Sequence, residues 1–106
     1  MLPKKNRLTY NEFQQNPNTS FHYNTKLIHV VRKITTGKIP RFVIIVPKRL
    51  EKKTVTRHQI RRILIELIRS IMPKIQNPFD FLVKPKKIFT KDMRVNIGKD
   101  LERMLI

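Results

Sequence analysis

The residues best suited to chemistry form one basic stretch in the middle of the chain, KRLEKKTVTRHQIRRILIELIR, from Lys48 to Arg69. Arginine makes paired hydrogen bonds to phosphate oxygens, and lysine presents a point positive charge to the same ligands. Only Glu51 and Glu66 oppose these cations within the stretch. A solvated charged surface without a partner is the alternative, but clustered arginine favours binding to a phosphate-rich partner.

Three histidines, His22, His29 and His58, are the other candidates for chemistry. Two imidazoles can act as acid and base in RNA cleavage, so an independent histidine nuclease is one hypothesis. Nothing in the histidine spacing favours it, and a lone histidine on a strand is more often structural. The chain has only 2 glycines and no Gly-rich phosphate loop, and its 7 acidic residues are scattered. We expect neither an autonomous protein active site nor a protein metal site.

Charge and length narrow the class of protein. The chain has 24 Lys and Arg against 7 Asp and Glu, a formal net charge of +17 on 106 residues. Such an excess is typical of proteins that bind a polyanion, with nucleic acid the first choice and an acidic membrane surface the second. No apolar run approaches the roughly 20 residues that span a bilayer, and the N-terminus has no apolar signal core. We expect one cytoplasmic domain over residues 1–106, with no membrane partner and no small-molecule substrate.

The basic stretch is expected to be carried by a helix from Thr56 to about Ile71, with Thr56 and Gln59 as a capping box and Pro73 beyond its end. At 100° per residue its core side comprises Ile60, Ile63, Leu64, Leu67 and Ile71. The opposite arc comprises Arg57, His58, Arg61, Arg62 and Arg69. Cations in the first turn oppose the helix dipole, so a bound anion would offset their cost.

Further elements complete an α+β reading in the order αββαβα. A short helix from Thr9 to Gln15 has a capping box of Thr9 with Glu12, and Leu8 with Phe13 forms a hydrophobic staple. Strands are expected at 20–34 and 41–46, paired as an antiparallel hairpin, and at 79–83. Periodic apolar residues predict a closing amphipathic helix after a cap at Thr90.

Three segments together resemble the protein component of bacterial ribonuclease P. They are MLPKKNRL followed by Glu12-Phe13, the strand RFVIIVPKRL, and the helix start KKTVTRHQIRR with Glu66. Arg57, His58 and Gln59 occupy the family's Arg-Asn-Arg triplet, and Arg61 with Arg62 matches the Lys-Arg that follows. His58 and Gln59 therefore replace the usual Asn and Arg, and Pro47 replaces a usual serine. The match covers about the first two thirds of the chain.

The resemblance implies a fold like the second domain of a bacterial ribosomal small-subunit protein, with a left-handed βαβ crossover. It implies the protein subunit of an endoribonuclease whose RNA subunit carries catalysis and cuts the 5′ leader from precursor tRNA. Its partners would be ribonuclease P RNA and precursor tRNA, and Mg²⁺ would be held mainly by RNA and substrate phosphates. The implied RNA-binding residues are Lys48, Arg49, Lys53, Arg57, His58, Gln59, Arg61, Arg62 and Arg69. The implied leader cleft comprises Phe13, Leu27, His29 and Ile45.

A ribosomal or general structural RNA-binding protein, without a leader-binding role, is the alternative that the residues leave open. It would have the same charge and a similar fold.

Overall fold

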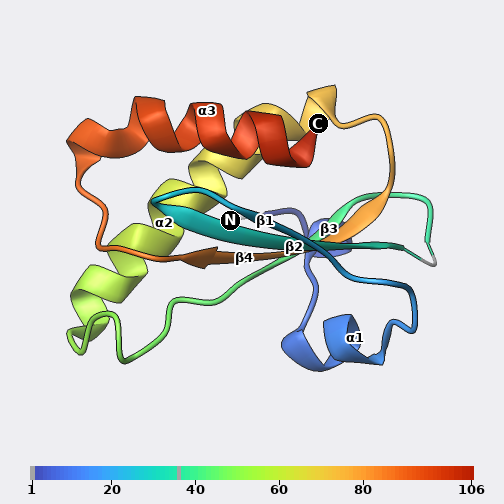
Figure 1. Cartoon of the computed structure of the whole chain (residues 1–106), viewed down its shortest axis with the longest axis horizontal. Coiled ribbons are helices and arrows are strands. Elements are labelled where there is room, and N and C mark those ends of the chain that lie inside the picture. Colours follow the sequence, from blue (N-terminus) through green and yellow to red (C-terminus); the bar gives the residue numbers. More distant parts are fainter. Residues whose placement is uncertain (1, 36) are drawn as a thin grey trace.

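A four-stranded sheet lies between one short helix on one face and two longer helices on the other (Figure 1). The computed structural model describes residues 2–35 and 37–106. Its elements are α1 (Tyr10–Gln15), β1 (Phe21–Asn24), β2 (Ile28–Ile34), β3 (Arg41–Ile44), α2 (Thr54–Ile71), β4 (Phe79–Pro85) and α3 (Arg94–Leu105). Three short 3-10 turns, Lys4–Asn6, Met72–Lys74 and Lys91–Met93, flank the helices. The α+β class is confirmed.

The element order contains one strand more than the predicted αββαβα. Residues 20–34 form two antiparallel strands, β1 and β2, instead of one. The Thr25 hydroxyl explains the break, because it accepts hydrogen bonds from the backbone N–H groups of Leu27 (3.3 Å) and Ile28 (3.2 Å). A threonine hydroxyl that accepts hydrogen bonds from the backbone two and three residues ahead stabilises a turn. The alternation of polar and apolar residues does not reveal such a turn.

The strand order is β1-β2-β4-β3, so the predicted hairpin between 20–34 and 41–46 is wrong. β4 lies between β2 and β3, antiparallel to the first and parallel to the second. A parallel pair requires a long crossover, and α2 supplies it between β3 and β4. The central position suits β4, because both faces of the strand are apolar: Phe81 and Val83 are buried on one face of the sheet and Leu82 on the other.

The larger core lies between the sheet and the helices α2 and α3. From α2 it receives Ile60, Ile63, Leu64, Ile68 and Ile71. This confirms most of the predicted apolar side, but Ile68 takes the fully buried position and Leu67 is only half-buried. The smaller core lies under α1 and consists of Leu8, Phe13, Val31 and Leu82.

The helix starts give mixed outcomes. The capping box of α1 is present, with the Glu12 N–H bonded to the Thr9 hydroxyl and the Thr9 N–H to the Glu12 carboxylate, each at 3.1 Å. The capping box predicted at Thr56 is wrong, because α2 already begins at Thr54 and no side chain caps it. Thr90 is likewise not a side-chain cap, since a 3-10 turn precedes the start of α3 at Arg94.

None of the helices in the described part of the chain is both long enough and apolar enough to span a membrane.

Candidate nucleic-acid interface

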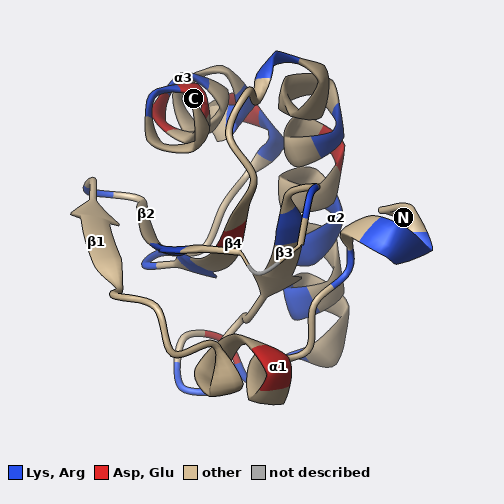
Figure 2. Cartoon of the chain, turned by 90° about the vertical axis from the view of Figure 1, so that its right-hand side faces the viewer, with Lys and Arg blue, Asp and Glu red and all other residues tan. Residues whose placement is uncertain are grey.

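Arginine positions recur along α2, from its first turn to its last (Figure 2). His58, Gln59, Arg61, Arg62 and Arg69 are all exposed, and Arg57 is half-buried. The side chains His58, Arg61, Arg62, Ile65, Glu66 and Arg69 line a shallow groove on the surface of this helix. We call the side of α2 that carries Arg57, His58, Arg61, Arg62 and Arg69 the α2 basic face. Their common exposure follows from helical spacing, because the buried residues of α2 occupy the opposite side.

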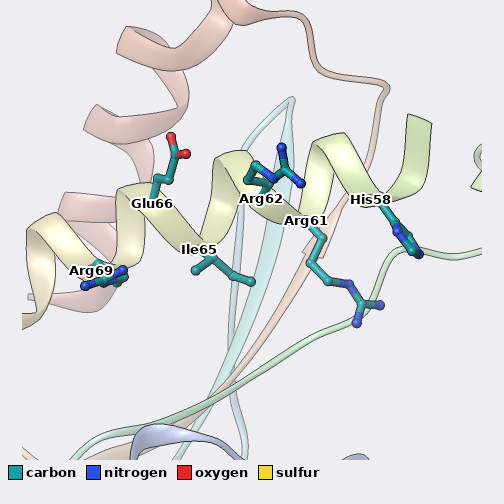
Figure 3. A pocket seen from close by; sticks show the side chains of 6 residues that line it. All are labelled: His58, Arg61, Arg62, Ile65, Glu66 and Arg69. Carbon is teal, nitrogen blue, oxygen red and sulfur yellow. The ribbon is translucent and has the colours of Figure 1, made fainter. Parts of the chain in front are cut away.

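Within the groove the cations point in more than one direction (Figure 3). His58, Arg61 and Arg69 project on the same side as Ile65, whereas Arg62 and Glu66 project away from them. Glu66, the only acidic residue of α2, is paired with Arg94 of α3 at 2.6 Å. The neighbouring helix therefore neutralises the one negative charge that opposes the α2 basic face.

Additional cations lie before α2 and beside it. Lys48 and Arg49 are exposed in the turn before α2, and Lys53 is exposed at the N-cap position. The N-terminal 3-10 turn with Lys4 and Lys5 lies on the same side of the molecule as α2 (Figure 2). The predicted RNA-binding residues of α2 are therefore accessible to solvent on two adjoining sides of the helix, and Lys48, Arg49 and Lys53 are exposed just before it.

A second groove continues the basic surface toward α3 and was not predicted. Gln59 and Arg62 of α2 line it together with Lys91 and Arg94. These two cations lie more than 20 residues further along the chain, where the sequence shows only a closing helix. Only the packing of α3 against α2 brings them to the basic face.

The face of the sheet that carries α1 is only partly covered. α1 and the preceding segment bury Val31 and Leu82 beneath Phe13 and Leu8. The next row of the sheet is formed by Asn24, His29 and Lys84, which are register partners across β1, β2 and β4. Directly opposed residues point to the same face, so these three side chains share the surface beside α1. Asn24 is exposed, whereas His29 and Lys84 are half-buried.

The four residues expected to line a leader cleft do not all lie together. His29 lies on this uncovered surface, and Ile45, which is half-buried, packs at the edge of the smaller core. Phe13 is only 5% exposed, so its ring forms the wall under α1 and is not free to contact a ligand. Leu27 packs against the larger core, because the turn before β2 interrupts the alternation that would have placed it beside His29.

A buried polar cluster fixes α1 to the sheet, and we call Asn16, Lys33, Arg41 and Asp80 the α1 anchor. Asp80, which is fully buried, accepts two hydrogen bonds from Arg41 (3.0 and 2.9 Å) and one from the Asn16 amide (2.9 Å). The ammonium group of Lys33 donates to the carbonyls of Phe13 (2.8 Å) and Asn16 (3.1 Å) at the end of α1. A cation at this end complements the helix carbonyls.

Arg41 also connects the sheet to the start of α1. Its guanidinium lies 3.7 Å from the Glu12 carboxylate. Hydrogen bonds from the backbone and then the hydroxyl of Thr9, followed by the charge of Arg41, hold the pKa of Glu12 below its usual value. The anchor therefore holds both ends of α1 and determines which part of the sheet stays uncovered.

The charges on the uncovered surface are positive. Partial burial, followed by the neighbouring charges of His22, Lys84 and Lys86, lowers the pKa of His29. His29 is consequently neutral over more of the physiological range than an isolated imidazole. In the described part of the chain, no three His, Cys, Asp or Glu side chains converge in a group that could hold a metal ion.

Comparison with known proteins places this geometry in a family. A sequence profile described as ribonuclease P matches residues 2–106. Among curated proteins no match was found.

Similar solved structures include the RNase P protein of Thermotoga maritima, with a TM-score of 0.74 and 18% identity over 93% of this chain and 94% of that one. A Staphylococcus aureus RNase P protein mutant gives a TM-score of 0.78 and 22% identity, covering 96% of this chain and 86% of the other. Another structure of the Staphylococcus aureus protein gives 0.66 and 25% identity, covering 99% and 90%. At 18 and 22% identity the likeness concerns the fold.

Proposed function

The chain belongs to the ribonuclease P protein family, whose members are the protein subunit of a ribonucleoprotein endoribonuclease. We propose that this protein binds the catalytic RNA and the 5′ leader of precursor tRNA. Family membership itself implies the ribonuclease P RNA as a partner. The proposal adds where each RNA is bound and assigns precursor tRNA as the second partner. We further propose that the protein works in the cytoplasm, with this RNA and its substrate.

The observation that carries the proposal is the pairing of two different surfaces on one small fold. The α2 basic face presents arginines that suit the phosphate-dense surface of a folded RNA. The uncovered sheet surface beside α1 combines the cation Lys84 with uncharged or weakly basic side chains such as His29 and Ile45. Such a surface suits a single strand, whose unpaired bases and backbone can both reach a sheet.

In this assignment Arg57, His58, Arg61, Arg62 and Arg69 hold the RNA subunit, with Lys48, Arg49, Lys53 and Gln59 at the margins of the surface. His29 and Ile45 contact the leader, and Phe13 supports them from beneath α1. Leu27 does not contact the leader in this assignment, because its side chain packs against the larger core. The protein contributes binding energy and neutralises phosphate charge, while Mg²⁺, held by RNA and substrate phosphates, supplies the metal chemistry of cleavage.

The test is single-turnover cleavage of a precursor tRNA by the cognate RNA subunit at low magnesium, with and without this protein. We expect a protein-dependent gain in cleavage rate or in substrate affinity. The Arg61→Ala/Arg62→Ala variant should need a higher protein concentration for the same gain, because it loses phosphate contacts. Lys99→Ala/Arg103→Ala, which removes two exposed cations from α3, is the matched control. Intact RNA binding with no gain in cleavage would instead indicate a general RNA-binding protein.

A further inference from the structure

Two histidines from different strands meet on the uncovered sheet surface. His22 lies in β1 and His29 in β2, and the strand register places them diagonally on the same face. Nδ1 of His22 and Nε2 of His29 are 3.1 Å apart, a hydrogen-bond distance. The two rings are nearly parallel, at 16°, with centroids 5.3 Å apart. His22 is exposed and His29 half-buried, so the pair is open to solvent at the His22 side.

The hydrogen bond limits how many protons the pair can hold. One ring must donate an N–H, and the other must accept it with a free nitrogen lone pair. The bonded pair therefore carries at most one positive charge. A further proton would remove the acceptor and place two cations in contact.

The groups around the pair oppose protonation in the free protein. Lys84 of β4 is the register partner of His29, and Asn24 of β1 is its neutral partner on the other side. The Lys86 ammonium donates to the carbonyl of Thr25 in the β1–β2 turn at 2.8 Å, which holds this cation close to the two strands. An anion placed here would reverse the balance, since it would attract both lysines and any proton on the pair.

We propose that His22, His29, Lys84 and Lys86 bind a backbone phosphate of the RNA leader, and that the histidine pair takes up a proton as the phosphate binds. This rests on the proposed function, because it assigns a contact within the leader-binding surface. It adds His22, Lys84 and Lys86 to that surface. Nε2 of His29 faces His22, so its other ring nitrogen, Nδ1, is the one left to donate to a phosphate.

Proton uptake by the pair gives the site a distinctive signature. If one proton is taken up on binding, leader affinity rises as the pH falls, by up to about tenfold per pH unit between the titration points of the bound and free states. RNA bound only through lysine and arginine has no such dependence between about pH 6 and pH 8, because both residues stay charged there. The effect should appear only for substrates that carry a leader.

The experiment is calorimetric binding of precursor tRNA to the complex of this protein with its RNA subunit, with calcium replacing magnesium to block cleavage. Titrations in buffers of different ionisation enthalpy, at about pH 7, count the protons taken up. Mature tRNA without a leader provides the reference for the same complex. We expect the leader to add an uptake of up to about one proton and to bind more tightly at lower pH.

Glutamine variants test which histidines are responsible. His22→Gln and His29→Gln keep a hydrogen-bonding side chain but do not titrate, so either should abolish the leader-dependent proton uptake and flatten the pH dependence. Lys84→Gln should weaken leader binding at every pH. Lys99→Gln, at an exposed position of α3 outside both proposed RNA surfaces, should leave the leader-dependent proton uptake in place. Circular dichroism of each variant verifies that it folds. Because His22→Gln and His29→Gln are tested separately, the result does not depend on both variants folding.

Two results would overturn the inference. Leader-dependent affinity with no proton uptake, or with the same uptake in the wild type and both glutamine variants, rejects the histidine site while the proposed function stands. A wild-type complex that binds precursor and mature tRNA equally at every pH rejects both.

Discussion

The two faces of the sheet differ in what holds the adjoining helices. On one face α2 and α3 pack through an extensive apolar core that includes Phe42, Phe81 and Leu64. On the other face α1 contributes one large buried ring, Phe13, and is held mainly by the α1 anchor around Asp80. Apolar burial is nondirectional and stabilises in proportion to area, whereas a polar anchor acts at defined points.

This difference separates stability from binding. The apolar face holds most of the buried hydrophobic residues, and it also places the α2 basic face outward on the far side of the same helix. The anchored face leaves the row of Asn24, His29 and Lys84 uncovered, since α1 spans only six residues. A larger helix there would bury more apolar surface and close the surface that we assign to the leader.

The largest expected effect is on the apolar face. Phe81 is fully buried, and its ring stacks on Phe42 at 5.1 Å between centroids. Phe81→Ala should lower the free energy of unfolding by about 3–5 kcal/mol, because it removes a large side chain and leaves a cavity. Chemical denaturation measures the loss. For a matched comparison, Val30→Ala in the larger core should cost more than Val31→Ala in the smaller core, and an equal cost would remove the distinction between the two faces.

The next effect tests the polar anchor. Asp80→Ala leaves the Arg41 guanidinium and the Asn16 amide without their shared acceptor. The expected cost is about 2–3 kcal/mol, moderated because Arg41 is partly exposed and can turn to water. Leader-dependent affinity should fall together with stability as α1 loses its position.

Asp80→Ala is therefore expected to lower both stability and leader affinity. Measuring leader affinity at a temperature where the variant is fully folded separates the second effect from the first. If the folded variant binds the leader as tightly as the wild type, then α1 does not define that surface.

A smaller effect, on binding alone, is expected on the α2 basic face. Arg57→Ala or Arg62→Ala should each weaken binding to the RNA subunit and reduce the salt dependence by about one unit of slope, as expected for one lost phosphate contact. Stability should change by no more than about 0.5 kcal/mol in Arg62→Ala, because Arg62 is exposed, and by about 1 kcal/mol at most in Arg57→Ala, which loses a hydrogen bond to the Thr54 hydroxyl. Binding isotherms over a range of salt concentrations provide the slopes. Unchanged slopes in both variants would mean that this face does not contact phosphate.

The smallest effect concerns pH. The pKa of His29 in the folded protein is below its ordinary value of 6.5, so the unfolded chain binds this proton more strongly. His29 therefore lowers stability as the pH falls through the ordinary histidine range toward the lower folded-state pKa.

His29→Gln should accordingly lose less stability than the wild type when the pH is lowered from about 7.5 to about 5.5. Thermal unfolding over this range measures the difference. Above about pH 8 imidazole is neutral in both states, and the two proteins should change in parallel. A steeper loss in the variant would show that His29 is stabilised by its charge.

Local sequence was sufficient for several features because they depend on neighbours within one turn. The capping box of Thr9 and Glu12, the staple of Leu8 and Phe13, and the outward position of Arg61 and Arg62 all follow from helical spacing. The exact start of α2 was missed, because the N-cap position is taken by Lys53, which makes no side-chain cap and so leaves no local signal. The break at Thr25 was missed because a single hydroxyl decides it.

The sequence by itself determined the strongly cationic character of the chain, the helix that carries its arginines, and the apolar side on which that helix packs. Only the tertiary structure decided that β4 enters between β2 and β3, that Asp80 meets Arg41 and Asn16, and that His22 faces His29. Helix faces follow from a fixed periodicity along the chain. Strand neighbours follow from a competition for burial among distant segments, which no local pattern records.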